Sequence, residues 1–66
     1  MRKPERLDKF YKELCDLHKN YLPDWRFGQL IFNFISETGD PFFYEEDAMI
    51  GMLKKYIAKI TGKDIL

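Results

Sequence analysis

Cys15 and His18 are the side chains in this sequence best suited to chemistry. They lie three residues apart in a segment with helical spacing, so they share one face of a helix. Such a pair can form a thiolate–imidazole couple or half of a metal site. A structural zinc needs four ligands, and only a dimer or added carboxylates would complete the set, because the chain has no other Cys or His. We therefore expect a small apolar side chain and a polar ring at the edge of a helix seam, with no metal, cofactor or catalytic site.

The densest acidic cluster is Glu45-Glu46-Asp47. Converging carboxylates would suit a cation or general acid–base catalysis. Successive helical residues point about 100° apart, however, so these three do not converge on one atom. Acids in the first turn of a helix are favoured by the helix dipole. We expect this cluster to begin a helix, and we expect the chain not to be an enzyme.

Phe42, Phe43 and Tyr44 form the most apolar stretch of loop, directly before those acids. Exposed rings at such a place anchor protein partners, because aromatic side chains dominate interface hot spots. Alternatively, rings that precede a helix close the core as a hydrophobic staple, and we expect at least one of the three to do so. Phe32 also lies off the apolar face of its predicted helix, which makes that helix apolar over a wide arc.

Trp25 and Arg26 could stack on a base and pair with a phosphate. The formal net charge of the 66 residues is zero, from 11 basic and 11 acidic residues, and no basic stripe accompanies these two side chains. We favour an arrangement in which Trp25 packs over the other helices and Arg26 pairs with an acid.

The charges are nevertheless segregated along the chain. The net charge is +2 over residues 1–26, −5 over residues 27–53 and +3 over residues 54–66. The acidic middle either attracts a cationic partner or pairs with the basic ends in the fold.

The chain lacks the sequence features of a secreted or membrane protein. A single cysteine allows no intrachain disulfide, no apolar run approaches the roughly 18 residues of a membrane span, and the first residues are charged. We expect a cytoplasmic protein with no membrane partner.

Three segments show helical spacing of apolar residues and predict helices over residues 4–22, 25–37 and 45–61. The first has the seam Leu7, Phe10, Leu14, Leu17 and Tyr21. The second has the apolar face Phe27, Leu30, Ile31, Phe34 and Ile35. The third has the apolar face Met49, Met52, Leu53, Tyr56, Ile57 and Ile60.

Residues that begin and end helices flank these segments. Asp24 is a good N-cap for the second helix, and Gly39 and Gly62 suit helix ends. Gly51, inside the third helix, suggests a close contact between helices. Residues 63–66 form a loose tail or fold back on the core through Ile65 and Leu66. The predicted fold is all-α, a small three-helix bundle in a single domain over residues 1–66, with neighbouring helices antiparallel.

Two stretches resemble a known family. Residues 23–30 read Pro-Asp-Trp-Arg-Phe-Gly-Gln-Leu, and residues 40–44 read Asp-Pro-Phe-Phe-Tyr. With Arg6-Leu7 and Phe10-Tyr11, they resemble a family of short uncharacterised helical proteins of Gram-positive bacteria and their phages and mobile elements. The resemblance implies a compact helical protein in a mobile-element setting and brings no assigned activity.

The same stretch directs attention to Arg26, Gln29 and Asn33, which share one helical face because they are three and four residues apart. They either bind a partner or serve as caps and inter-helix hydrogen bonds, and we favour the second.

We predict a non-enzymatic protein-interaction module that binds another protein or a second copy of itself, because its large apolar side chains exceed what so short a chain can bury. The alternative is a small nucleic-acid-associated accessory or regulatory protein that uses Arg2, Lys3, Arg6 and Arg26. The predicted contact residues are Phe32, Phe42, Phe43, Tyr44, Trp25, Arg26, Gln29 and Asn33.

Overall fold

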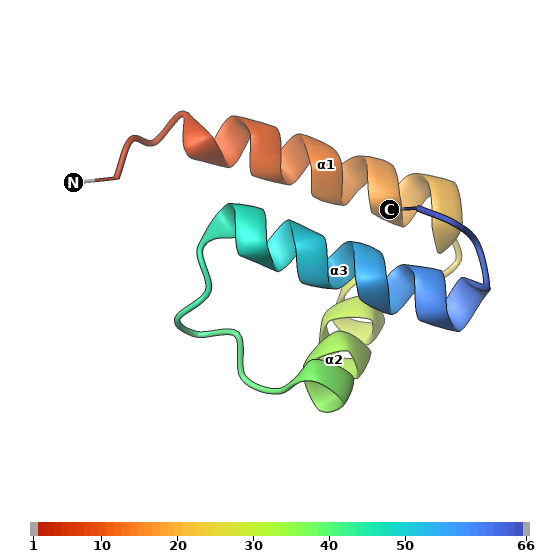
Figure 1. Ribbon diagram of the computed structural model, residues 1–66. Coiled ribbons are helices and arrows are strands. Elements are labelled where there is room, and N and C mark those ends of the chain that lie inside the picture. The colour runs from red at the N-terminus through yellow and green to blue at the C-terminus, as the bar shows by residue number, and fades with distance from the viewer. Residues whose placement is uncertain (1, 66) are drawn as a thin grey trace.

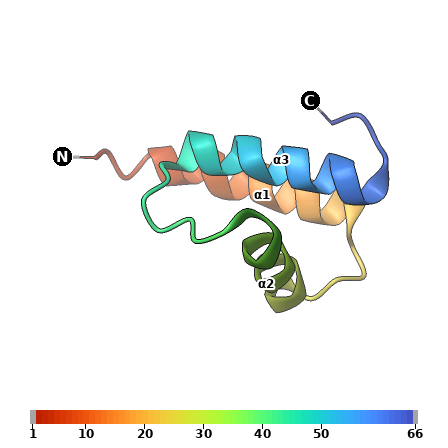
Figure 2. The same ribbon diagram turned by 60° about the horizontal axis from the view of Figure 1, so that its bottom comes forward.

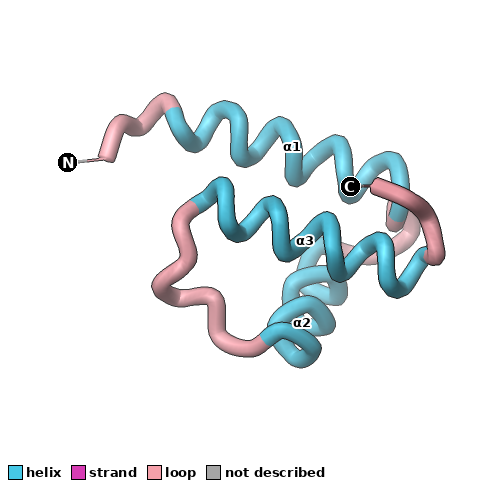
Figure 3. Tube along the Cα trace, viewed as in Figure 1, coloured by secondary structure: helices cyan, strands magenta, loops and turns pink. Residues whose placement is uncertain are grey.

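The computed structural model describes residues 2–65, which form three helices: α1 (Arg6–Tyr21), α2 (Phe27–Thr38) and α3 (Glu46–Thr61). This confirms the predicted all-α, three-helix fold, and each helix begins and ends within two residues of its predicted bounds. No strand occurs within residues 2–65. Figure 1 shows the order of the helices, and Figure 3 shows the two loops that join them.

Helices α1 and α3 lie side by side and run in the same direction (Figures 1 and 2). Arg6, the first residue of α1, forms an ion pair with Glu46, the first residue of α3, with Nε and Oε1 2.6 Å apart. At the other end, the Nζ atom of Lys63 lies 5.7 Å from the ring centroid of Tyr21. The N-terminal ends of α1 and α3 therefore lie together, as do their C-terminal ends, so the two helices are parallel.

Helix α2 crosses α3 and makes no close backbone approach to α1 (Figure 2). This differs from the expected antiparallel packing of chain neighbours. The loop between α1 and α2 turns sharply at Pro23, where the N–H of Trp25 donates to the carbonyl of Leu22 at 3.1 Å. The only fully buried side chains of α2 are Leu30 and Phe34, so the helix has one covered face, which meets α3.

The core lies where the three helices approach each other and consists of apolar side chains. Its buried members are Leu14, Leu17, Leu22, Leu30, Phe34, Ile50, Leu53, Tyr56 and Ile57. Three residues predicted for buried faces, Phe27, Ile35 and Ile60, are exposed, and Ile50 is buried although it was not predicted. For Phe27 and Ile35 of α2, the cause is the crossing of this helix, which leaves one of its flanks without a neighbouring helix.

Two predicted details of the helix ends and interiors are wrong. Arg26, not Asp24, is the N-cap of α2, because the helix begins two residues later than expected. The backbone N–H of Arg26 donates to Oε1 of Gln29 at 2.7 Å. Apart from the adjacent backbone of α3, a Cβ atom on Gly51 would meet nothing within 4 Å, so this glycine marks no close contact between helices within residues 2–65.

The glycines that end helices behave as predicted. Gly39 has φ +94° and Gly62 has φ +72°, which favour glycine, and their N–H groups donate to the carbonyls of Ile35 and Ala58. Ile65 packs against the core, whereas Leu66 lies outside the described residues. No helix within residues 2–65 has the combined length and apolar character that crossing a membrane requires.

Candidate functional site

A hydrogen-bonded turn over residues 41–44 holds the most exposed rings of the chain. The backbone N–H of Phe42 donates to Oδ1 of Asp40 at 3.0 Å. The N–H of Tyr44 donates to the carbonyl of Pro41, also at 3.0 Å. Aspartate and proline favour such turns because the carboxylate accepts from the backbone two residues on and the ring of proline fixes φ. Two hydrogen bonds therefore fix the backbone of the loop between α2 and α3 where Phe42 and Phe43 occur.

The turn presents both phenylalanine rings to solvent. Phe42 is 77% exposed and Phe43 is 90% exposed. Their ring centroids lie 4.9 Å apart with planes inclined by 75°, an edge-to-face contact. Tyr44 is covered more but is still exposed, so the expectation that one of these rings closes the core as a staple is wrong. The turn prevents it, because it holds the three side chains away from the buried cluster.

A second exposed apolar region lies on one flank of α2. Phe32 is 72% exposed, and Ile35, three residues further, is also exposed. Gly28 lies four residues before Phe32, so all three fall within an arc of about 60° around the helix. Neither Gly28 nor Ile35 is among the contact residues predicted from the sequence. The signal was their spacing from Phe32, which places them beside it on the side of α2 that α3 does not cover.

The other predicted contact residues of α2 and its preceding loop have different surroundings. Trp25 is half-buried and packs against the core, as expected. Gln29 uses its side-chain oxygen to cap α2, which confirms a capping role for this member of the polar face. Arg26 and Asn33 are exposed. The structure thus brings Arg26 and Gln29 together through the cap, while Phe32 lies about 100° around the helix from Asn33.

Cys15 and His18 do not form a couple. Cys15 is exposed, and a ring nitrogen of His18, Nε2, lies 2.6 Å from the carbonyl oxygen of Trp25. A carbonyl only accepts, so Nε2 is the donor in this hydrogen bond. This bond ties α1 to the following loop, and it gives His18 a structural role. Within residues 2–65, no three His, Cys, Asp or Glu side chains are grouped so that they could hold a metal ion.

The acidic middle of the chain pairs with the basic ends, which confirms one of the two expected alternatives. Glu45 binds Arg2 with Oε1 and Nη2 2.5 Å apart, Glu46 binds Arg6, and Glu37 of α2 binds Lys59 of α3. The hydrogen bond from Arg2 lowers the pKa of Glu45, and the hydrogen bond to Glu37 raises the pKa of Lys59. These pairs fix the start of α3 against α1 and the end of α2 against α3.

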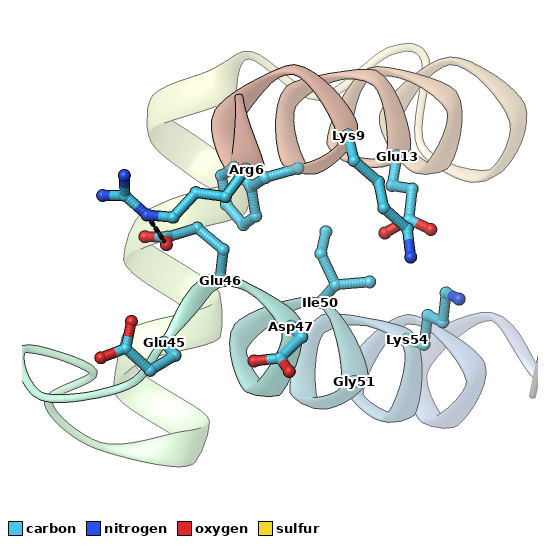
Figure 4. A pocket seen from close by; sticks show the side chains of 10 residues that line it. Arg6, Lys9, Glu13, Glu45, Glu46, Asp47, Ile50, Gly51 and Lys54 are labelled. Atoms are coloured by element: carbon cyan, nitrogen blue, oxygen red, sulfur yellow. Dashed lines mark hydrogen bonds and ion pairs between the residues drawn. The ribbon is translucent and has the colours of Figure 1, made fainter. Parts of the chain in front are cut away.

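A groove of about 580 Å³ between α1 and α3 was not predicted (Figure 4). Phe10, Ile50 and Gly51 give it an apolar floor, and charged side chains of both signs rim it. Figure 4 shows the ion pair of Arg6 and Glu46 across one end. Lys9 and Glu13 of α1 and Asp47 and Lys54 of α3 rim the rest. The groove follows from the parallel pairing of α1 and α3, which the sequence does not reveal, and its mixed rim favours neither an anionic nor a cationic ligand.

Comparisons with known proteins find no relative: no protein-family model, curated protein or solved structure matches the chain. The resemblance of residues 23–30 and 40–44 to a family of phage and mobile-element proteins therefore stays a prediction.

Proposed function

We propose that this chain is a non-enzymatic protein-interaction module that binds a partner protein through Phe42 and Phe43. The observation that carries the proposal is the turn over residues 41–44, in which two hydrogen bonds hold a pair of phenylalanine rings 77% and 90% exposed. Exposed aromatic pairs of this kind are unfavourable in water and become favourable when a partner covers them.

The rings are large enough to dominate a complex. Burial of one phenylalanine side chain contributes about 1.5–3 kcal/mol, so the pair contributes about 3–6 kcal/mol when both are covered. The turn also reduces the entropy that is lost on binding, because its backbone is already fixed by Asp40 and by the Pro41–Tyr44 hydrogen bond. The matching partner surface is an apolar pocket or groove that accepts two adjacent rings.

The nucleic-acid alternative has less support. Of its four proposed contact residues, Arg2 and Arg6 form ion pairs with Glu45 and Glu46. Their charge is therefore compensated within the chain, and phosphate contacts would have to compete with these carboxylates. The cytoplasmic location and the phage or mobile-element setting belong to the proposal and depend on the sequence alone.

The experiment compares capture of partners from a host lysate by the wild-type chain and by the double variant Phe42→Ser/Phe43→Ser. The captured protein is then purified and titrated against both chains. We expect the double variant to bind at least about 100-fold more weakly, as for hot-spot residues. Tyr11→Ser is the matched control, because Tyr11 is an exposed ring on α1, far from the turn in the sequence.

Two results would contradict the proposal. One is a partner that binds the double variant as tightly as the wild type. The other is capture that disappears when the lysate is treated with nuclease, which would favour the nucleic-acid alternative.

A further inference from the structure

The chain exposes more surface than a compact monomer of its size. Its accessible surface is 5103 Å², whereas a folded monomer of 8.0 kDa exposes about 4,450 Å². Its radius of gyration of 11.9 Å also exceeds the value of about 10.8 Å for a compact domain of this length. The excess of about 650 Å² is close to the area that each partner buries in a small stable interface, about 600–800 Å².

The flank of α2 formed by Gly28, Phe32 and Ile35 is where the helix lacks a neighbour. Leu30 and Phe34 attach α2 to α3, and no part of α1 approaches the helix backbone. Phe32 is more exposed than any other helical residue among the large apolar side chains. This flank therefore presents an apolar strip that a second helix would cover.

The charge of α2 favours an identical partner. The only charged residue between Phe27 and Thr38 is Glu37, and it already pairs with Lys59 of its own chain. A flank without free charge gives a charged partner nothing to pair with. It also meets a copy of itself without the repulsion between like charges that a two-fold interface would otherwise create.

Gly28 gives the flank a shape that matches Phe32. Apart from the adjacent backbone of α2, a Cβ atom on Gly28 would meet nothing within 4 Å, so nothing within residues 2–65 requires glycine there, although glycine weakens a helix. In an antiparallel pair of helices centred between residues 28 and 32, the ring of Phe32 from each chain lies over Gly28 of the other. Each two-fold interface contains this contact twice.

We propose that the chain forms a two-fold dimer in which this flank of α2 packs antiparallel against the same flank of a second copy, with Phe32 of each chain over Gly28 of the other. The proposal does not depend on the proposed function, because the turn with Phe42 and Phe43 is a different surface. A dimer of this kind carries two such turns.

The experiment is sedimentation equilibrium of the full chain over a range of concentrations. We expect a monomer–dimer equilibrium, and we expect Phe32→Asp to raise the dissociation constant about a thousandfold, because the substitution occurs twice in each interface. Phe43→Asp is the matched control, since it also places a charge at an exposed phenylalanine, and it should leave the dissociation constant unchanged.

A pair of alanine variants tests the contact between Phe32 and Gly28. Gly28→Ala and Gly51→Ala each replace a helical glycine whose Cβ has open space, so each should raise the melting temperature of the monomer. Only Gly28→Ala should also raise the dissociation constant of the dimer, about tenfold, because two methyl groups enter the interface.

Three results would overturn the dimer. They are a wild-type chain that stays monomeric into the high micromolar range, equal effects of Phe32→Asp and Phe43→Asp, and equal effects of the two alanine variants on dissociation. Loss of partner capture by Phe42→Ser/Phe43→Ser with an intact dimer would agree with both proposals, and either the capture or the dimer can fail without the other.

Discussion

The ring of Phe34 packs edge to face against the ring of Tyr56, with centroids 5.8 Å apart and planes inclined by 70°. Phe34 has no exposed surface, and Tyr56 is buried beside it. The backbone of α2 comes close only to that of α3, so this contact and the burial of Leu30 are central to the attachment of α2.

Phe34→Ala should remove this attachment. A buried phenylalanine replaced by alanine costs about 3–5 kcal/mol, because transfer energy is lost and a cavity remains. A core in a chain of this length supplies about 3–5 kcal/mol in total, so the variant should be largely unfolded at room temperature. Urea unfolding followed by far-ultraviolet circular dichroism measures the change.

Phe43→Ala is the control for that substitution. It deletes the same atoms from a ring that is almost fully exposed, and it loses at most the contact with Phe42, about 1 kcal/mol. Equal unfolding midpoints for the two variants would mean that Phe34 does not attach α2 to α3.

The helices could be predicted from the sequence because local features determine them. Apolar side chains recur at three and four residues in each helix, and Pro23, Gly39 and Gly62 end them by restricting or freeing the backbone. The sequence predicts Asp24 as the N-cap of α2 because an acid is a good cap, yet Arg26 has this position and Gln29 caps the helix from inside.

The arrangement of the helices could not be predicted, because it depends on contacts between distant residues. The ion pair of Arg6 with Glu46 joins residues 40 positions apart and aligns α1 with α3, and the spacing of apolar residues carries no sign of it. The groove between these helices follows from the same alignment. The candidate site was predicted by residue type at Phe42 and Phe43, but their exposure is decided by the hydrogen bond from the backbone of Phe42 to Asp40.

The ion pair of Arg2 and Glu45 predicts a dependence of stability on pH in the acid range. The hydrogen bond from Arg2 lowers the pKa of Glu45 below its ordinary value of 4.5. A carboxyl group whose pKa is lowered in the folded state contributes stability that is present above its unfolded pKa. This contribution is lost as the pH falls through the lower, folded pKa. Both side chains are exposed, so we expect a small effect, larger at low salt.

A titration of the Glu45 carboxyl followed by nuclear magnetic resonance measures this coupling directly. Arg2→Gln should raise the pKa of Glu45 towards its ordinary value, because the charged guanidinium donor is removed. Arg26→Gln, at an exposed arginine of the loop before α2, should leave it unchanged. If the pKa of Glu45 were the same with and without Arg2, the pair would not exist in solution.

Tyr56 predicts a second transition at alkaline pH. Burial raises the pKa of its hydroxyl above the ordinary value of 10.0, and the negative charge of Glu37 raises it further. For a group whose folded pKa is raised, the stabilising contribution is complete below the unfolded pKa of 10.0 and is lost as the pH rises through the folded value. Ionisation would place a phenolate among Phe34 and its neighbours, so alkaline pH should loosen α2 from α3.

Ultraviolet absorbance should show a tyrosinate component that Tyr56→Phe removes, and the same variant should move alkaline unfolding to higher pH. Tyr11→Phe is the matched control, because this ring is exposed on α1, and it should leave the unfolding transition in place. An alkaline transition that is identical in wild type and Tyr56→Phe would show that the hydroxyl of Tyr56 does not couple to the attachment of α2.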